Sequence, residues 1–189
     1  MSTAFVCPEA DYHGNPFRYC GVKGCGWMET PSKRPSYVYV ASSWRNIMQE
    51  GVCAALRSVG IDHYDFKNPE GSTGFSWREV KTQGVPSAEG IKPKGSDWEQ
   101  VDEYLRMVQH PRAIEGFDAD FAAMQRADTF VMVLPCGKSA HLELGWAVGA
   151  GKRTIILLED PVEPELMYRM CDEMYTSLFD LLGALGVED

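Results

Sequence analysis

The sequence contains no long run of apolar residues. Although 44% of its 189 residues are hydrophobic, no apolar stretch approaches the length that a membrane-spanning helix requires. The opening stretch, MSTAFVCPEADYHG, lacks the basic and apolar regions that are typical of a signal peptide. We therefore expect a cytoplasmic protein that has no membrane partner.

Basic residues are also scarce relative to acidic ones. Lysine and arginine number 18 against 27 aspartates and glutamates, which gives a net charge of −9. Because duplex nucleic acids and anionic membranes attract basic surfaces, this balance argues against nucleic acid as the main partner. It remains compatible with a small anionic ligand that a few local donors hold.

The six cysteines are scattered along the chain, and in a reducing compartment we expect most of them to be free thiols. One group differs, since Cys7, His13, Cys20 and Cys25 place four zinc-type ligands within nineteen residues. Structural zinc sites usually pair their cysteines two to four residues apart, and Cys7 has no such partner. We therefore interpret residues 1–35 as an irregular N-terminal arm, keep a weak zinc site as the alternative, and expect no cofactor.

From residue 36 onward, short strands alternate with helices. The stretch SYVYVAS is β-branched and aromatic, and DTFVMVLP is almost continuously apolar, as in strands that are buried on both faces. Strands that alternate with helices indicate a parallel, helix-covered sheet, so we predict an α/β, Rossmann/flavodoxin-like three-layer domain over 36–189. We expect strands at 36–42, 61–66, 128–135 and 153–159, and helices at 44–60, 97–108, 112–127 and 140–151, followed by C-terminal helices that end near Leu185.

Residues 67–98 form a long, mostly polar stretch rich in glycine and proline, which we interpret as a loop insertion in this domain. A loop of that length inside a compact domain is usually functional or disordered. Its aromatic residues Phe75 and Trp77 either stack on a base or form a small core of the loop itself.

Glu143 is the residue whose chemistry is hardest to explain by packing. In parallel sheets, ligands bind beyond the carboxyl ends of the strands, and the stretch PCGKSAHLE follows the most apolar strand. A glutamate near the start of a helix is ordinarily a solvated residue that the helix dipole favours. Here the neighbours Leu142 and Leu144 are apolar, which favours a functional role instead.

Three stretches, YVYVASSW, GFDADFAAMQRADTFVMVLP and HLELGWAVGAGK, together resemble the nucleoside 2-deoxyribosyltransferase superfamily, including its nucleotide N-glycosidase branch. The resemblance covers about residues 37–159, and the 67–110 stretch matches poorly. It implies that Glu143 is the nucleophile at the anomeric carbon of a sugar, that Tyr39 orients this carboxylate, and that Asp120 handles the proton or holds the sugar and base. Taken alone, a tyrosine in the position of Tyr39 is more often a core aromatic, and an aspartate in that of Asp120 a surface residue of a helix; the resemblance makes a functional role equally favoured for each.

The residue types suit this chemistry. Breaking an N-glycosidic bond passes through an oxocarbenium-like state, which an ionised carboxylate stabilises and can trap covalently. The departing base needs a proton, so a second acid near the sugar is useful.

The sequence departs from the transferases at one position. They carry an acidic residue six positions before the glutamate, where this chain has Gly137. Nucleotide hydrolases of the superfamily instead carry a serine in this loop, and a serine and an arginine after the first strand, which hold a 5′-phosphate. Ser139, Ser43 and Arg45 match that pattern, with Ser42 adjacent. The alternative for Ser43 and Arg45 is that they cap and begin the helix that follows.

The resemblance implies an enzyme that cleaves the N-glycosidic bond of a nucleoside 5′-monophosphate, or of a nucleoside, and releases the free base. Base exchange between nucleosides, a nucleotide-sensing module and an NAD-type glycohydrolase are the alternatives. Members of this superfamily commonly complete each pocket with a neighbouring subunit, so we also expect a homo-oligomer, most simply a homodimer. Leu142, Trp146 and Met167 either form its contact or belong to the core.

Overall fold

The computed structural model describes residues 34–71, 74–77, 80, 104–160 and 163–187. The zinc-type residues Cys7, His13, Cys20 and Cys25, and most of the 67–98 stretch, lie outside the described residues. None of the helices in the described ranges is long and apolar enough to cross a membrane.

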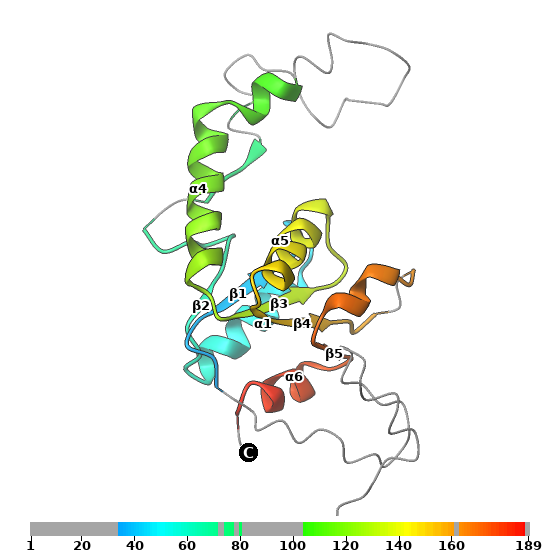
Figure 1. The fold of residues 1–189 in the computed structure, drawn as a ribbon. Coiled ribbons are helices and arrows are strands. Elements are labelled where there is room, and N and C mark those ends of the chain that lie inside the picture. Colours follow the sequence, from blue (N-terminus) through cyan, green and yellow to red (C-terminus); the bar gives the residue numbers. More distant parts are fainter. Residues whose placement is uncertain (1–33, 72–73, 78–79, 81–103, 161–162, 188–189) are drawn as a thin grey trace, which may run out of the picture. The chain divides into compact units, whose positions relative to one another are not determined.

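Five strands form one sheet in the described part of the chain (Figure 1). They lie in the order β2-β1-β3-β4-β5, and every neighbouring pair is parallel. The strands are β1 (Val38–Ala41), β2 (His63–Tyr64), β3 (Thr129–Val133), β4 (Arg153–Leu157) and β5 (Glu173–Tyr175). This arrangement confirms the predicted α/β fold with a parallel sheet.

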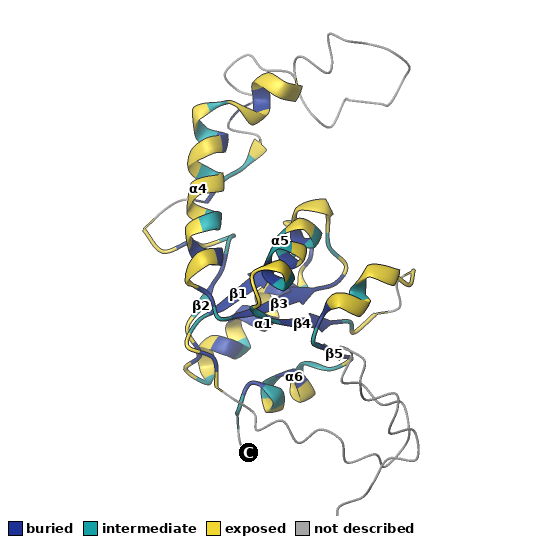
Figure 2. Ribbon diagram, viewed as in Figure 1, coloured by how far each residue is buried: buried dark blue, intermediate teal, exposed yellow. Residues whose placement is uncertain are grey.

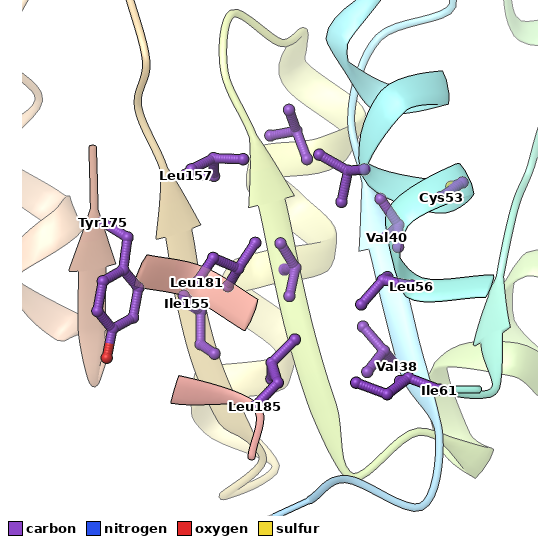
Figure 3. Close-up of a cluster of buried hydrophobic side chains, with 13 residues drawn as sticks. Val38, Val40, Cys53, Leu56, Ile61, Ile155, Leu157, Tyr175, Leu181 and Leu185 are labelled. Carbon is purple, nitrogen blue, oxygen red and sulfur yellow. The ribbon is translucent and has the colours of Figure 1, made fainter. Parts of the chain in front are cut away.

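Helices cover both faces of this sheet, which gives three layers (Figure 1). One face carries α1 (Met48–Ser58) and α6 (Leu178–Ala184), and the other carries α5 (Lys138–Gly149). Figure 3 shows the core between the sheet and the first pair of helices. Its members are Val38, Val40, Val131, Val133, Ile155, Leu157 and Tyr175 of the sheet, Val52, Cys53 and Leu56 of α1, and Ile61, Leu181 and Leu185.

The face under α5 holds the residues between those positions, as the two-residue period of a strand requires. Tyr39 and Phe130 are buried there, and their rings stack with centroids 5.0 Å apart. α5 packs over β1, β3 and β4, and it buries Ala140, Leu144 and Ala147. The same helix carries Glu143, the candidate nucleophile from the sequence.

The chain after β4 differs from the prediction, which expected only helices in this part of the sequence. It forms a short 3₁₀ helix, η3 (Leu166–Met170), then the strand β5, and then α6. Glu173 of β5 is 7% exposed and binds Arg153 of β4 through two hydrogen bonds of 2.7 and 2.8 Å. The prediction was wrong here because a charged residue with a buried partner interrupts the apolar pattern that identifies a strand.

The described residues form two compact units. The first holds the sheet with α1, α5 and α6, and the second is the described part of Asp65–Gln125, with most of α4 (Pro111–Arg126). The bounds of α4 confirm the helix predicted at 112–127.

In the second unit Phe75 packs against α4, because a Cβ atom at Gly116 would come within 2.6 Å of the Cβ atom of Phe75.

Candidate active site

The sheet order changes direction at the carboxyl ends of β1 and β3. The chain moves outward from β1 to β2 in one direction and from β3 to β5 in the other, so the order reverses between β1 and β3. In open parallel sheets, ligands bind at such a reversal, because the loops after the two strands diverge there. The loops in question are residues 42–47 and 134–137.

A buried asparagine joins these two loops. The side-chain amide nitrogen of Asn46 lies 3.2 Å from the carbonyl oxygen of Val133 and 3.1 Å from that of Pro135. It also donates to the Ser42 hydroxyl at 3.1 Å, and that hydroxyl donates to Val133 at 2.8 Å. Ser42 therefore holds the loop framework, and Asn46 is a site residue that the sequence reasoning missed. The sequence did offer one indication of this role, because Asn46 is a polar residue just before a predicted helix.

The loop after β1 forms a turn before α1 begins. The Ser43 hydroxyl accepts a hydrogen bond from the main-chain nitrogen of Arg45 at 3.2 Å, and the carbonyl of Ser43 accepts one from Asn46 at 2.9 Å. The helix begins only at Met48, whose nitrogen donates to the side chain of Asn46, so the alternative that Ser43 caps a helix over 44–60 was wrong. The turn leaves the Arg45 side chain exposed at the sheet edge.

Glu143 lies in the second turn of α5, because this helix begins at Lys138 rather than at residue 140 as predicted. It is half-buried, between the exposed Leu142 and the buried Leu144. It is therefore not a fully solvated surface glutamate, which was the alternative to a functional role.

The electrostatic effect of Glu143 on Cys136 indicates where the Glu143 carboxylate lies relative to the sheet. Burial, and then the negative charge of Glu143, raise the pKa of the Cys136 thiol to about 12. Since charges in a protein interact appreciably only over short distances, the carboxylate lies near Cys136, just past the end of β3. The thiol stays protonated at neutral pH, so the carboxylate has a neutral neighbour.

Tyr39 lies in β1 on the face that α5 covers. It is 1% exposed, and its ring lies between those of Tyr64 and Phe130, at centroid distances of 5.4 and 5.0 Å. Its ring is thus a core aromatic. This packing fixes the ring in one orientation, which a residue that orients a carboxylate requires.

Three of the predicted site residues belong to the second unit. Asp120 is half-buried in α4. The Phe75 ring meets the Trp77 ring edge to face, with centroids 4.9 Å apart, and Trp77 is 41% exposed. With the packing of Phe75 against α4, this supports the alternative in which the two aromatics form a small core of their own.

Gly137 is the N-cap residue of α5, and no described side chain caps this end of the helix. A Cβ atom built on Gly137 would have no described atom within 4 Å, so the position has room for a side chain. Lys138 and Ser139 follow in the exposed first turn. The uncapped amides, the lysine and the helix dipole together favour an anion at this end of α5.

His141 and Tyr168 form a contact that the sequence did not indicate. The Nδ1 atom of His141 lies 2.8 Å from the Gly137 carbonyl oxygen, and Nε2 lies 2.9 Å from the Tyr168 hydroxyl. The two rings stack at a centroid distance of 5.7 Å. Tyr168 was missed because it lies in η3, where the sequence has no motif.

Among the described residues, no group of three or more His, Cys, Asp or Glu side chains is placed to bind a metal.

Comparison with known proteins gives similarity in structure only. No protein-family model matches the chain, and no curated protein matches it in sequence. A 2-deoxyribosyltransferase from Bacillus psychrosaccharolyticus is 20% identical with a TM-score of 0.43, over 80% of this chain and 92% of that one. The CMP N-glycosidase of Clostridium botulinum is 15% identical with a TM-score of 0.40, over 80% and 99%. A conserved protein from Enterococcus faecalis is 12% identical with a TM-score of 0.47, over 80% and 97%. The printed names of the first two are those of a transferase and an N-glycosidase.

Proposed function

We propose that this protein cleaves the N-glycosidic bond of a nucleoside 5′-monophosphate and releases the free base, with Glu143 as the nucleophile. The observation that carries this proposal is the position of Glu143. It is half-buried on α5, within electrostatic reach of the protonated Cys136 thiol, which follows β3. β3 borders the reversal of strand order, where parallel sheets bind ligands.

The reaction follows from the chemistry of a carboxylate beneath a sugar ring. An oxygen of Glu143 forms a bond to the anomeric carbon while the C–N bond breaks, and the electron pair of that bond leaves with the base. Asp120 supplies the proton that the departing base takes up, a role that rests on the sequence resemblance. Water then attacks the same carbon, the bond to Glu143 breaks, and the carboxylate is restored. Tyr39 orients the nucleophile from β1.

The phosphate lies between the loop after β1 and the start of α5. Arg45 offers an exposed guanidinium on the first, and Lys138 and Ser139 occupy the exposed first turn of the second. A guanidinium binds phosphate with two parallel hydrogen bonds, and a helix N-terminus favours negative charge. Ser43 remains a candidate phosphate ligand; its hydroxyl accepts a hydrogen bond from the main-chain nitrogen of Arg45. Ser42 contributes indirectly, because its hydroxyl links the loop after β1 to the carbonyl of Val133.

Release of free base from a panel of nucleosides, nucleoside 5′-monophosphates and NAD, followed by chromatography, tests this function. We expect turnover of a 5′-monophosphate with water as the acceptor. Exchange of one free base for another would instead make the protein a transferase, and NAD cleavage would make it a dinucleotide glycohydrolase. Binding of a nucleotide without base release would contradict the enzymatic proposal.

Arg45→Ala tests the phosphate part separately. Because a charge-assisted hydrogen bond contributes about 1.5–3 kcal/mol, this change should raise KM for the nucleotide roughly tenfold or more. Activity on the unphosphorylated nucleoside should hardly change. Arg57→Ala, in the last turn of α1, removes an exposed arginine away from the site and serves as the control. Equal effects of Arg45→Ala on both substrates would exclude a phosphate contact.

A further inference from the structure

Aromatic rings form a continuous row across the first unit, which we call the aromatic ladder. It runs from Tyr64 of β2 to Tyr39 of β1, continues to Phe130 of β3, and ends at Trp146 of α5. The centroids of successive rings lie 5.4, 5.0 and 6.0 Å apart. These distances fall within the range over which aromatic rings attract one another.

The register of the sheet places the first three rings side by side. Tyr39 pairs with Tyr64 on one side and with Phe130 on the other, in parallel strands. Neighbouring strands lie about 4.8 Å apart, so paired rings on one face of a sheet stack. The strands β1 and β3 are buried along their whole length (Figure 2), and Tyr39 and Phe130 are 1% and 0% exposed. Neither ring therefore turns without moving its neighbour.

The ladder leaves the sheet at Phe130. The register partner of Phe130 in β4 is Thr154, whose side chain has no ring to continue the row. The next ring comes instead from Trp146 of α5, which meets Phe130 at an interplanar angle of 49°. The ladder thus joins β1 to the helix that covers this face, through a single ring of β3.

Trp146 is the largest side chain with which α5 contacts the sheet. The buried residues of α5 are Ala140, Leu144 and Ala147, so two of the three are alanines. Because the attraction between packed groups grows with the number of atoms in contact, alanines hold a helix in one rotational setting only weakly. The contact between Trp146 and Phe130 is the stronger restraint on that setting.

Glu143 shares a face of α5 with Trp146. Residues three positions apart in an α-helix are neighbours on its surface. The contact that places Trp146 on Phe130 therefore also sets the direction of Glu143, almost one turn earlier. Tyr39, on the other side of Phe130, is the residue that orients this carboxylate in the proposed function. Both groups take their positions from the same ring.

We propose that Phe130 and Trp146 are positioning residues, and that the Phe130 ring, held between Tyr39 and Trp146, aligns the strand tyrosine with the helix that carries Glu143. This inference rests on the proposed function and adds two residues to it. Neither touches the substrate or the reacting atoms. A misplacement of about 1 Å in such a pair lowers a rate about a hundredfold.

Substitutions in the ladder remove a ring and keep an apolar side chain. Phe130→Leu and Trp146→Leu break the row at different points, and Trp146→Phe keeps a ring beside Phe130. Trp146 is half-buried, so its variants carry the test if Phe130→Leu fails to fold. Ile155→Val is the matched control, because Ile155 is 0% exposed and belongs to the core on the opposite face of the sheet.

The NMR signal of the ring carbon that bears the Tyr39 hydroxyl measures the alignment without any need for turnover. In the full chain with isotope-labelled tyrosine, Tyr39→Phe identifies this signal. Glu143→Gln should shift it, because an amide replaces the carboxylate near the hydroxyl. Phe130→Leu and Trp146→Leu should shift it as well, Trp146→Phe should shift it less, and Ile155→Val should leave it in place.

Kinetics on a nucleoside 5′-monophosphate should give the same order. We expect kcat to fall roughly tenfold to a hundredfold in both leucine variants and less than about threefold in Trp146→Phe, with KM within about twofold of the native value. In a Tyr39→Phe background, Phe130→Leu should lower kcat less than about threefold further, because the pair that the ladder aligns is already broken.

The results separate this inference from the proposed function. An unchanged Tyr39 signal in both leucine variants, an equal shift in Ile155→Val, or a full further loss of kcat in the Tyr39→Phe background would overturn the ladder, even if base is released. The expected order of shifts without release of base from any nucleotide would keep the alignment of Tyr39 with Glu143 and overturn the proposed reaction.

Discussion

Asn46 donates its side-chain amide to the main-chain carbonyl of Val133, 3.2 Å away, and thereby joins the loop after β1 to the end of β3. Asn46 is 5% exposed, and its side-chain oxygen accepts from the nitrogen of Met48 at 2.8 Å. One side chain thus sets both the start of α1 and the spacing of the two loops that border the candidate site.

Substitutions of Asn46 should therefore affect stability and activity together. Asn46→Ala removes the donor to the carbonyls of Val133 and Pro135, of which that of Val133 keeps the Ser42 hydroxyl, and it should lower the free energy of unfolding by about 1–3 kcal/mol. Asn46→Asp keeps the acceptor for Met48 but sets a charged oxygen against the carbonyls of Val133 and Pro135, so it should destabilise more than alanine does. Urea denaturation measures both changes. Native stability in the aspartate variant would contradict this role of Asn46.

The paired charges of Arg153 and Glu173 should contribute more to stability than a comparable surface pair. The Glu173 side chain is 8% exposed, whereas Glu115, which pairs with Arg112 on α4, is 63% exposed. Removing one partner of a buried pair leaves a buried charge uncompensated, so Glu173→Gln should cost about 3–5 kcal/mol. Glu115→Gln should cost about 0–1 kcal/mol, because exposed pairs are weak. Thermal unfolding of the two variants compares them, and equal losses would refute the argument.

The sequence predicted the parts of this fold that rest on apolar pattern. β1, β3 and β4 are buried apolar runs with few polar interruptions, and α4 begins at Pro111, a residue that favours the first helical position. What the sequence did not predict depends on partners far along the chain. β5 needs the contact between Glu173 and Arg153, which are twenty residues apart, and no local pattern encodes such a contact.

The same limit applies to the candidate site. Glu143 was identified because a carboxylate between two leucines is unusual in the sequence itself. Asn46 and Tyr168 were not, since the role of each depends on a carbonyl or ring that only the folded chain brings near. The start of α1 was misplaced for a related reason, because the side chain of Asn46, not that of Ser43, accepts from the first turn.

Gly137 offers a test of the charge preference at the start of α5. Asp and Asn are both favoured N-cap residues, and a side chain at this position has room among the described atoms. Gly137→Asn and Gly137→Asp should therefore both fold with Tm at or slightly above the native value. Only the aspartate brings a negative charge to the proposed phosphate, so it should raise KM for a nucleotide well above that of the asparagine variant. Equal KM values in the two variants would place the phosphate elsewhere.

We also predict a homodimer, with Leu142 and Met167 in the contact. They are 76% and 54% exposed, so the alternative that they belong to the core of the described chain was wrong, whereas Trp146 is half-buried. Light scattering at micromolar concentration should give twice the mass of the 21.1 kDa chain. Leu142→Glu should give the monomer, and Phe179→Glu, at an exposed position on α6, should not. A fully active native monomer would contradict this prediction.

The most direct test of the central claim is base release by Glu143→Gln. The amide keeps the shape and hydrogen bonding of the side chain and removes the nucleophilic charge, so turnover of a nucleoside 5′-monophosphate should fall by several orders of magnitude. Tm should stay near the native value, because the residue is only half-buried. Glu50→Gln, an exposed glutamate in the first turn of α1, is the matched control and should keep full activity. Substantial base release by Glu143→Gln would remove Glu143 from the role of nucleophile.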